Sequence, residues 1–127
     1  EFPRIDERRA GLPYRHGWFA GHAPGAERLL RMQARLVHVD HAAPRPDVYT
    51  FEPPDRMSEP VFVPRGADAE EGDGWILATV WRGATHTSDL AVFDARHVAA
   101  GPLCIASLPH RVPDGFHGNW FGADFPR

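Results

Sequence analysis

Hydrophobic and polar residues alternate over short stretches along most of the chain, which is the pattern of β-strands with one buried face. The clearest stretches cover residues 75–81 and 89–94, and similar ones lie at 17–20, 34–40, 48–52, 59–63 and 103–108. Segments rich in proline, glycine and aspartate separate them, as expected of turns. Only residues 26–32 and 95–100 have a helical pattern, and each is long enough for one or two turns. We therefore expect an all-β, antiparallel fold.

The strand pattern repeats along the chain. Glu1-Phe2-Pro3-Arg4-Ile5 opens one set of about four strands that closes near Phe51, and residues 59–63 open a second set that closes near Leu108. Four-stranded units in series are typical of β-propeller blades, although a spacing of 58 residues between Glu1 and Glu59 exceeds the usual blade period of roughly 40–50. The pattern predicts blade-like units at 1–52 and 58–108.

Two blades cannot close a propeller, which needs about four or more. The chain is therefore expected to be the C-terminal part of one larger propeller domain, with residues 109–127 as a closing strand segment. The first strand of a blade lines the central axis, where Glu1 and Glu59 would need polar partners. The alternative is that both glutamates protect sheet edges from aggregation. Proline is tolerated at the first residue of a strand, which favours the axial position.

Composition narrows the classes of function. The 13 prolines and 12 glycines among 127 residues agree with many short elements, and the net charge of −3 gives no basic stripe for nucleic acid. Cys104 is the sole cysteine, which excludes a disulfide framework or a thiolate cluster within this chain, and its apolar neighbours predict a buried position. No apolar run reaches the length of a membrane-spanning helix. A reducing, cytoplasmic compartment is compatible with this composition.

His117 is the first candidate for chemistry. It lies between Gly115 and Gly118 and is flanked by the aromatic side chains of Phe116 and Trp120. The glycines would let another group approach the imidazole closely, as a metal ligand requires. The alternative is a glycine-rich turn in which the imidazole hydrogen-bonds only the backbone.

Other histidines and acidic residues are weaker candidates. His38, Asp40 and His41 resemble a metal cluster, but the polar end of a hairpin explains them more simply. The acidic run at 68–73 lacks the spacing of a calcium loop and is expected to be a solvated connection. His110 is expected to have a structural or supporting role. The remaining histidines lie in predicted loops or at strand ends without a partner pattern: His16, His22, His86 and His97.

Several motifs together resemble the C-terminal part of the carotenoid cleavage oxygenases, which include a retinal-pigment isomerase and bacterial lignostilbene and apocarotenoid dioxygenases. The resemblance covers nearly the whole chain, in order, and the combination of motifs is specific. It also implies a seven-bladed propeller, which agrees with the repeat. The motifs are Glu1-Phe2-Pro3-Arg4-Ile5-Asp6, Ser58-Glu59-Pro60-Val61-Phe62-Val63-Pro64, Asp73-Gly74-Trp75, Leu90-Ala91-Val92-Phe93-Asp94-Ala95 and Leu108-Pro109-His110-Arg111-Val112-Pro113-Asp114-Gly115-Phe116-His117-Gly118.

The resemblance implies a non-haem iron(II) held by four histidines, three of which are oriented by glutamates. His117 matches the last iron ligand, and Glu59 and Glu1 match two of the orienting glutamates. Glu59 is expected to serve His117, and Glu1 a histidine outside this chain, as are the other three ligands. Phe116 and Trp120 are candidates for the wall of the substrate cavity, with core packing as the alternative.

The activity implied by the resemblance is oxidative cleavage of a conjugated carbon–carbon double bond by dioxygen. The substrate would be an apolar carotenoid, apocarotenoid or stilbene, and the products two carbonyl compounds. Peripheral membrane contact is expected only through parts outside this chain, and the isolated chain is expected to be inactive because it lacks three ligands. The alternative function is a non-catalytic propeller that serves as a binding or scaffold module.

Overall fold

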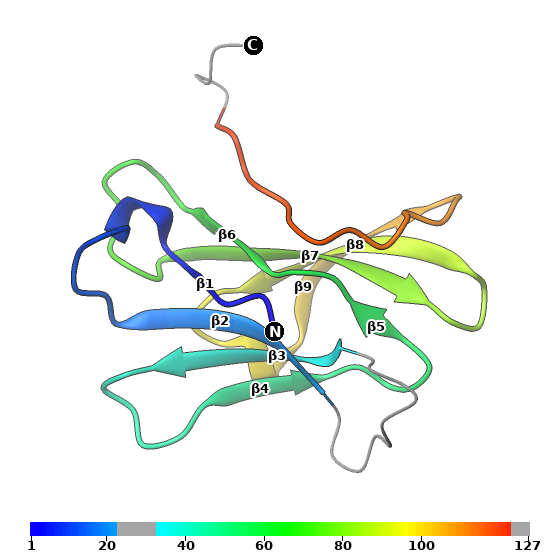
Figure 1. Ribbon diagram of the computed structural model, residues 1–127, viewed down its shortest axis with the longest axis horizontal. Helices are drawn as coiled ribbons and strands as arrows, with labels where there is room; N and C mark the ends of the chain where they lie inside the picture. The colour runs from blue at the N-terminus through cyan, green and yellow to red at the C-terminus, as the bar shows by residue number, and fades with distance from the viewer. Residues whose placement is uncertain (23–32, 123–127) are drawn as a thin grey trace.

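A computed structural model describes residues 1–22 and 33–122, and it confirms an all-β, antiparallel architecture (Figure 1). The predicted helical turn at 26–32 lies outside the described residues. The first sheet has the order β1-β2-β3-β4; the second has the order β5-β7-β8-β9, with β6 also paired to β7. The strands are β1 (Arg4–Ile5), β2 (His16–His22), β3 (Gln33–Asp40), β4 (Asp47–Thr50), β5 (Arg56–Met57), β6 (Val61–Pro64), β7 (Gly74–Arg82), β8 (Thr87–Asp94) and β9 (Pro102–Leu108).

Helical structure among the described residues is limited to two short 3₁₀ turns, η1 (Glu7–Arg9) and η2 (Val98–Ala100). The second falls within the predicted helical piece at 95–100. No helix in the described part of the chain is long and apolar enough to cross a membrane. Strands therefore provide almost all of the framework on which functional side chains are held.

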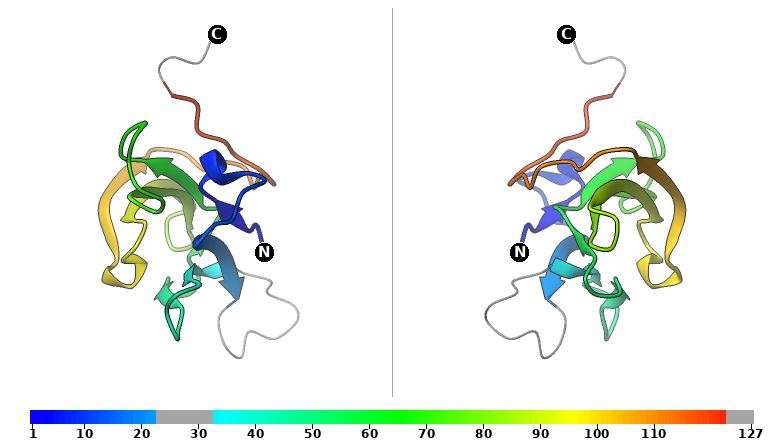
Figure 2. Two further views of the ribbon diagram at one scale, coloured as in Figure 1. Left: turned by 90° about the vertical axis from the view of Figure 1, so that its left-hand side faces the viewer. Right: turned by 90° about the vertical axis from the view of Figure 1, so that its right-hand side faces the viewer.

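The hydrophobic core lies between the two sheets, which sit next to each other with β1 beside β6 (Figures 1 and 2). Alternate residues of β2 and β7 are buried, as the sequence pattern predicts. Trp18 of the first sheet is fully buried and stacks on Phe62 of the second, with ring centroids 4.8 Å apart. The indole Nε1 of Trp18 donates to the carbonyl of Ala95 at 2.7 Å, so its polar atom is satisfied inside the core.

Strands β5 and β6 together form one edge of the second sheet, which we call its inner strand. This inner strand is interrupted at a proline, Pro60. Met57 pairs with Val80 and Val61 pairs with Leu77, so three residues, 58–60, face two residues of β7. An extra residue on one strand is the mark of a β-bulge, and proline fits there because it has no N–H to donate. The strand predicted at 59–63 therefore begins at Val61, and Glu59 lies outside the regular ladder.

The inner strand of the first sheet is interrupted in the same way. Glu1 exchanges two backbone hydrogen bonds with Ala20, and Arg4 pairs with Trp18, so residues 2–3 face a single residue of β2. Pro3 occupies the last position of this interruption, as Pro60 does in the second sheet. The strand predicted from Glu1 is consequently reduced to Arg4–Ile5.

The closing segment is not the strand that the sequence pattern predicted. Residues 109–122 follow β9 without regular structure and run back across the second sheet toward its inner edge. The backbone N–H of Val112 donates to Ser88 Oγ at 3.0 Å, and Asp114 forms an ion pair with Arg56 at 2.9 Å. Two prolines in this segment lack N–H donors, and bonds to side chains replace a strand ladder.

Cys104 is exposed, contrary to the prediction of a buried residue. It lies on β9, the outer edge strand of the second sheet, where five of seven residues are exposed. An apolar run on an edge strand has no neighbouring layer to cover it among the described residues. The prediction that Cys104 is buried was therefore wrong, because it rested on the apolar composition of the run and not on the position of the strand in the sheet.

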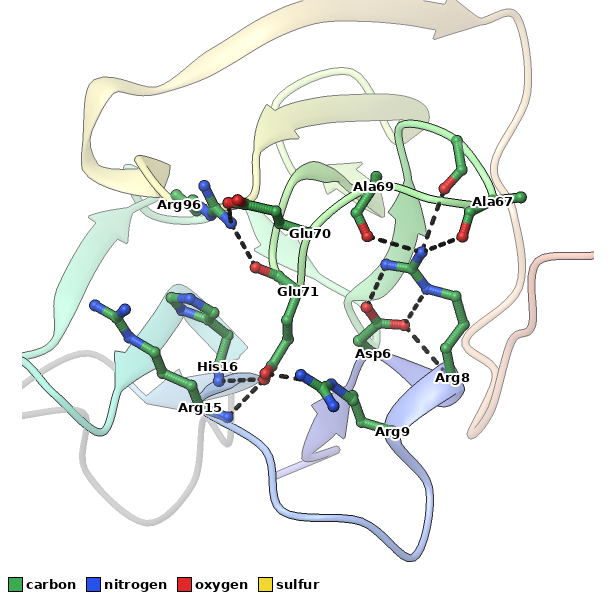
Figure 3. A network of polar contacts seen from close by, with 11 residues as sticks. Asp6, Arg8, Arg9, Arg15, His16, Ala67, Ala69, Glu70, Glu71 and Arg96 are labelled. Atoms are coloured by element: carbon green, nitrogen blue, oxygen red, sulfur yellow. Dashed lines mark hydrogen bonds and ion pairs between the residues drawn. The ribbon is translucent and has the colours of Figure 1, made fainter.

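A polar network joins the first sheet to the loop between β6 and β7 (Figure 3). Arg8 pairs with the buried Asp6 and donates to backbone carbonyls in the loop, at 2.8 Å for Ala67. Glu71 accepts a backbone hydrogen bond from His16 at 2.9 Å, and its side chain is only 11% exposed. The acidic loop is therefore partly a structural tie and not simply a solvated connection.

Candidate functional site

His117 and Glu59 meet at the inner edge of the second sheet. The Nδ1 atom of His117 lies 3.1 Å from Oε1 of Glu59, while Glu59 is 6% exposed and the His117 side chain is 72% exposed. An ionised carboxylate can only accept, so this contact assigns the proton to Nδ1 and leaves the lone pair on Nε2. The bulge at residues 58–60 explains how Glu59 leaves the ladder to make this contact.

The carboxylate of Glu59 is held from three directions. Besides His117, the guanidinium of Arg4 lies 2.9 Å from each of its oxygens, and the backbone N–H of Gly118 donates to Oε2 at 2.7 Å. Burial raises the pKa of Glu59, but the hydrogen bonds from Arg4, Gly118 and His117 outweigh it and lower the pKa below its ordinary value. Glu59 is therefore a fixed carboxylate at neutral pH.

The glycines beside His117 are not needed to make space for another group within the described part of the chain. A Cβ at Gly115 would meet nothing within 4 Å, and one at Gly118 would make an ordinary contact with Val61 at 3.7 Å. These contacts therefore do not support the expectation that the glycines let another group approach the imidazole. The observed role of Gly118 is its backbone N–H, which any residue except proline would supply.

The first sheet also contributes to the surroundings of His117. Phe2, in the bulge that precedes β1, meets the imidazole edge to face with ring centroids 6.1 Å apart. Phe2 has a φ of 54°, in the left-handed region that non-glycine residues rarely adopt, so the bulge constrains its backbone. Glu1 is exposed and accepts a hydrogen bond from Gln33 Nε2 at 2.7 Å. Its predicted role toward a histidine elsewhere stays a prediction.

A hollow of about 600 Å³ lies next to His117. Phe116 and Trp120 line it and are 80% and 53% exposed, so neither is packed into the core of the described residues. Apolar residues of the inner strands and of β7 form much of the remaining wall, including Phe2, Met57, Val61 and Leu77. The hollow thus has a mixed wall, in which these apolar residues alternate with polar ones such as Ser58, Thr79 and Ser88, and the His117–Glu59 pair lies at its border.

The described residues contain no group of three or more histidine, cysteine or acidic side chains that could hold a metal ion. A single imidazole does not make an iron site, so further ligands would have to come from outside these residues. His117 nevertheless has the chemistry expected of one ligand in a site made of four histidines. A metal-binding histidine usually donates its other ring N–H to a carboxylate, as His117 does to Glu59.

A contact between two buried histidines, His16 and His38, was not predicted from the sequence. His16 and His38, on neighbouring strands, are 5% and 4% exposed, and Nδ1 of His16 lies 3.0 Å from Nε2 of His38. Burial lowers the pKa of both residues, to about 4 for His38. Asp40 instead forms an ion pair with Arg15 at 2.6 Å, so the apparent cluster of His38, Asp40 and His41 is divided among separate contacts.

The register of β2 and β3 explains why the pair was missed. Trp18 pairs with His38 and His16 pairs with Asp40, which places His16 diagonal to His38 on one face. The alternation within each strand puts each histidine on that face. Their proximity depends on a register that the sequence alone does not fix, because a long connection separates the two strands.

Comparison with known proteins supplies the context for the site. Residues 1–122 match the model of the family described as retinal pigment epithelial membrane protein. The lignostilbene-alpha,beta-dioxygenase isozyme III of Sphingomonas paucimobilis is 45% identical over 97% of this chain and 26% of its own length. The chain therefore spans about a quarter of the length of this relative.

Solved structures share the fold. The lignostilbene dioxygenase of Pseudomonas brassicacearum superposes with a TM-score of 0.87 at 33% identity, over 95% of this chain and 27% of its own. The cobalt-substituted apocarotenoid oxygenase of Synechocystis superposes with a TM-score of 0.84 at 30% identity, over 95% of this chain and 25% of its own. Cobalt substitution marks that relative as a metalloenzyme. By sequence and by fold, the chain belongs to the retinal pigment epithelial membrane protein family, the family of the carotenoid cleavage oxygenases.

Proposed function

We propose that this chain is the C-terminal part of a non-haem iron(II) dioxygenase that cleaves a conjugated carbon–carbon double bond. The observation that carries the proposal is the 3.1 Å contact between Nδ1 of His117 and the fixed carboxylate of Glu59, beside a hollow that is lined in part by apolar residues. In this proposal the two sheets are two blades of a seven-bladed propeller, and residues 109–127 form the segment that brings His117 to the axis.

His117 would supply one of four histidine ligands, through Nε2, and three would come from parts of the protein outside this chain. Glu59 keeps the proton on Nδ1, so Nε2 retains its lone pair and the imidazole keeps one orientation. Four neutral imidazoles would leave the iron with open positions, and when bound it would activate dioxygen for the reaction. Glu1 would orient one of the other histidines.

The substrate class we propose is an apolar conjugated molecule such as a stilbene, with apocarotenoids as the second class to assay. Both oxygen atoms of dioxygen end in the two carbonyl products, so the overall cleavage needs no external reductant. Phe116 and Trp120 would contact the substrate through the hollow they line. The 45% identity to a lignostilbene dioxygenase supports testing stilbenes first.

The test is an assay of the intact protein for iron content and for aldehyde products from a hydroxystilbene and an apocarotenal. We expect cleavage that is lost on chelation and restored by iron(II). His117→Ala should lower iron content sharply and abolish turnover, while His110→Ala, in the same segment and exposed, should retain both. Full iron retention by His117→Ala would contradict the assignment. The isolated 127-residue chain should show neither tight iron binding nor turnover.

A further inference from the structure

Arg4 belongs to the first sheet, yet its guanidinium lies within the candidate site of the second. Its Nε and Nη2 atoms lie 2.9 Å from Oε1 and Oε2 of Glu59, so the ion pair engages both carboxylate oxygens. The Arg4 side chain is 15% exposed and Glu59 is 6% exposed. Nη2 donates a hydrogen bond to Oε2, while Nε is close to Oε1 as an ion-pair contact without a hydrogen bond, so one hydrogen bond and the nearby positive charge hold the carboxylate in place.

The same guanidinium also holds the segment that carries His117. It donates to the carbonyl oxygen of Gly118 and lies 3.2 Å from Oδ1 of Asn119. The two residues that follow His117 are therefore anchored to β1, across 114 and 115 positions of sequence. Arg4 thus contacts the group that orients the imidazole and the backbone that carries it.

From these contacts we infer that Arg4 is a positioning residue for the metal: it fixes Glu59 and residues 118–119 so that Nε2 of His117 faces the iron. The inference rests on the proposed function, because it assumes that His117 is a ligand. Arg4 itself would touch neither metal nor substrate. Partners one step removed from a metal ligand typically change metal affinity by about 10–100-fold when they are removed.

The competing explanation is that Arg4 merely ties the two sheets together. Arg8 offers a matched control, because it also extends from the first sheet to the second. Arg8 pairs with the buried Asp6 and donates to carbonyls of the β6–β7 loop, including those of Ala67 and Ala69 (Figure 3). Within the described part of the chain, its side chain bonds Asp6 and these loop carbonyls and forms no hydrogen bond or ion pair with Glu59 or His117. A purely structural role predicts similar effects of the two arginines on the metal.

The experiment compares Arg4→Met, Arg4→Lys, Arg8→Met and His117→Ala in the intact protein. For each variant, the cobalt(II) affinity, the visible spectrum of the cobalt-loaded protein and the melting temperature would be measured. We expect Arg4→Met to weaken cobalt binding by about 10–100-fold and to shift the spectrum, since the ligand geometry changes. Arg8→Met should retain the native affinity and spectrum even where its melting temperature falls by as much as that of Arg4→Met.

Arg4→Lys should recover only part of the affinity, because an ammonium group cannot engage both carboxylate oxygens and the Gly118 carbonyl together. Native affinity and spectrum in Arg4→Met, or equal losses in Arg4→Met and Arg8→Met, would overturn the inference. His117→Ala separates this failure from that of the proposed function. If His117→Ala retains cobalt, the ligand assignment is wrong; if it loses cobalt while Arg4→Met does not, only the role of Arg4 is wrong.

Discussion

The molecule uses histidine in two opposite settings. His16 and His38 are 5% and 4% exposed and hydrogen-bond each other, while the His117 side chain is 72% exposed and bonds the carboxylate of Glu59. In the buried pair, one ring nitrogen of each histidine is used by the other imidazole. In His117, the carboxylate takes the N–H of Nδ1 and leaves the lone pair of Nε2 directed away from that contact.

The difference shows that the partner, more than the burial, separates a structural histidine from a candidate ligand. Two imidazoles that share a hydrogen bond satisfy each other and become part of the core. An imidazole that donates to a fixed anion gains basicity at its other nitrogen, which is useful only if something else binds there. The buried pair is thus expected to affect stability, and His117 to affect metal binding.

The largest expected difference between the buried pair and His117 is in the free energy of unfolding when each histidine is replaced. We expect His38→Ala to lower the free energy of unfolding by about 3 kcal/mol, because it leaves a cavity and removes the partner of buried His16. His117→Ala in metal-free protein should cost under about 1 kcal/mol, since its side chain is mostly exposed. Urea unfolding of the two variants measures the difference. Equal losses would show that the two settings do not differ as described.

A smaller effect concerns pH. The unfolded chain protonates His38 near pH 6.5, whereas burial and the neighbouring His16 hold the folded pKa at about 4. The unfolded state therefore binds more protons between these values, so stability is fully present above pH 6.5 and falls as pH drops toward 4. We expect a loss of about 2 kcal/mol between pH 7 and pH 5.

His38→Gln should reduce this pH dependence, since the side chain no longer titrates. Urea midpoints at pH 7, 6 and 5 would measure it, with His86→Gln as an exposed control that keeps the native slope. An unchanged slope in His38→Gln would exclude His38 as its cause.

The smallest effect concerns the connection of the buried pair to the core. Trp18 stacks on His38 with ring centroids 5.4 Å apart and on Phe62 with centroids 4.8 Å apart. Trp18→Phe keeps an aromatic ring there but leaves the carbonyl of Ala95 without its indole donor. We expect a loss of about 1.5 kcal/mol in the urea unfolding free energy, with metal content unchanged. Loss of metal in this variant would link the core to the site.

Strand positions were largely predictable, because alternation records which face is buried. The stretch at 75–81 corresponds to β7 (Gly74–Arg82), and that at 89–94 falls within β8 (Thr87–Asp94). The inner strands were not, because a bulge depends on how many residues the partner strand places opposite. Edge position was equally hidden, which is why the apolar run around Cys104 was wrongly expected to be buried.

The site was predictable in part. The resemblance of the motifs pointed to Glu59 and His117, and the structure places their side chains in contact. It gave no indication of Arg4, because an arginine near a chain end has many possible partners in sequence and only the fold selects one. The assignment of His117 as a ligand stays a prediction until metal binding is measured.

The order of residues along the chain has a consequence for how the protein matures. Among the described residues the buried core ends at Val98, whereas the site joins Arg4 and Glu59 to residues 117–119. During synthesis the core and the Arg4–Glu59 ion pair can form before His117 leaves the ribosome. Within this chain, metal binding through His117 would then follow folding of the core, and a product that stops after β9 would keep this core while lacking the histidine.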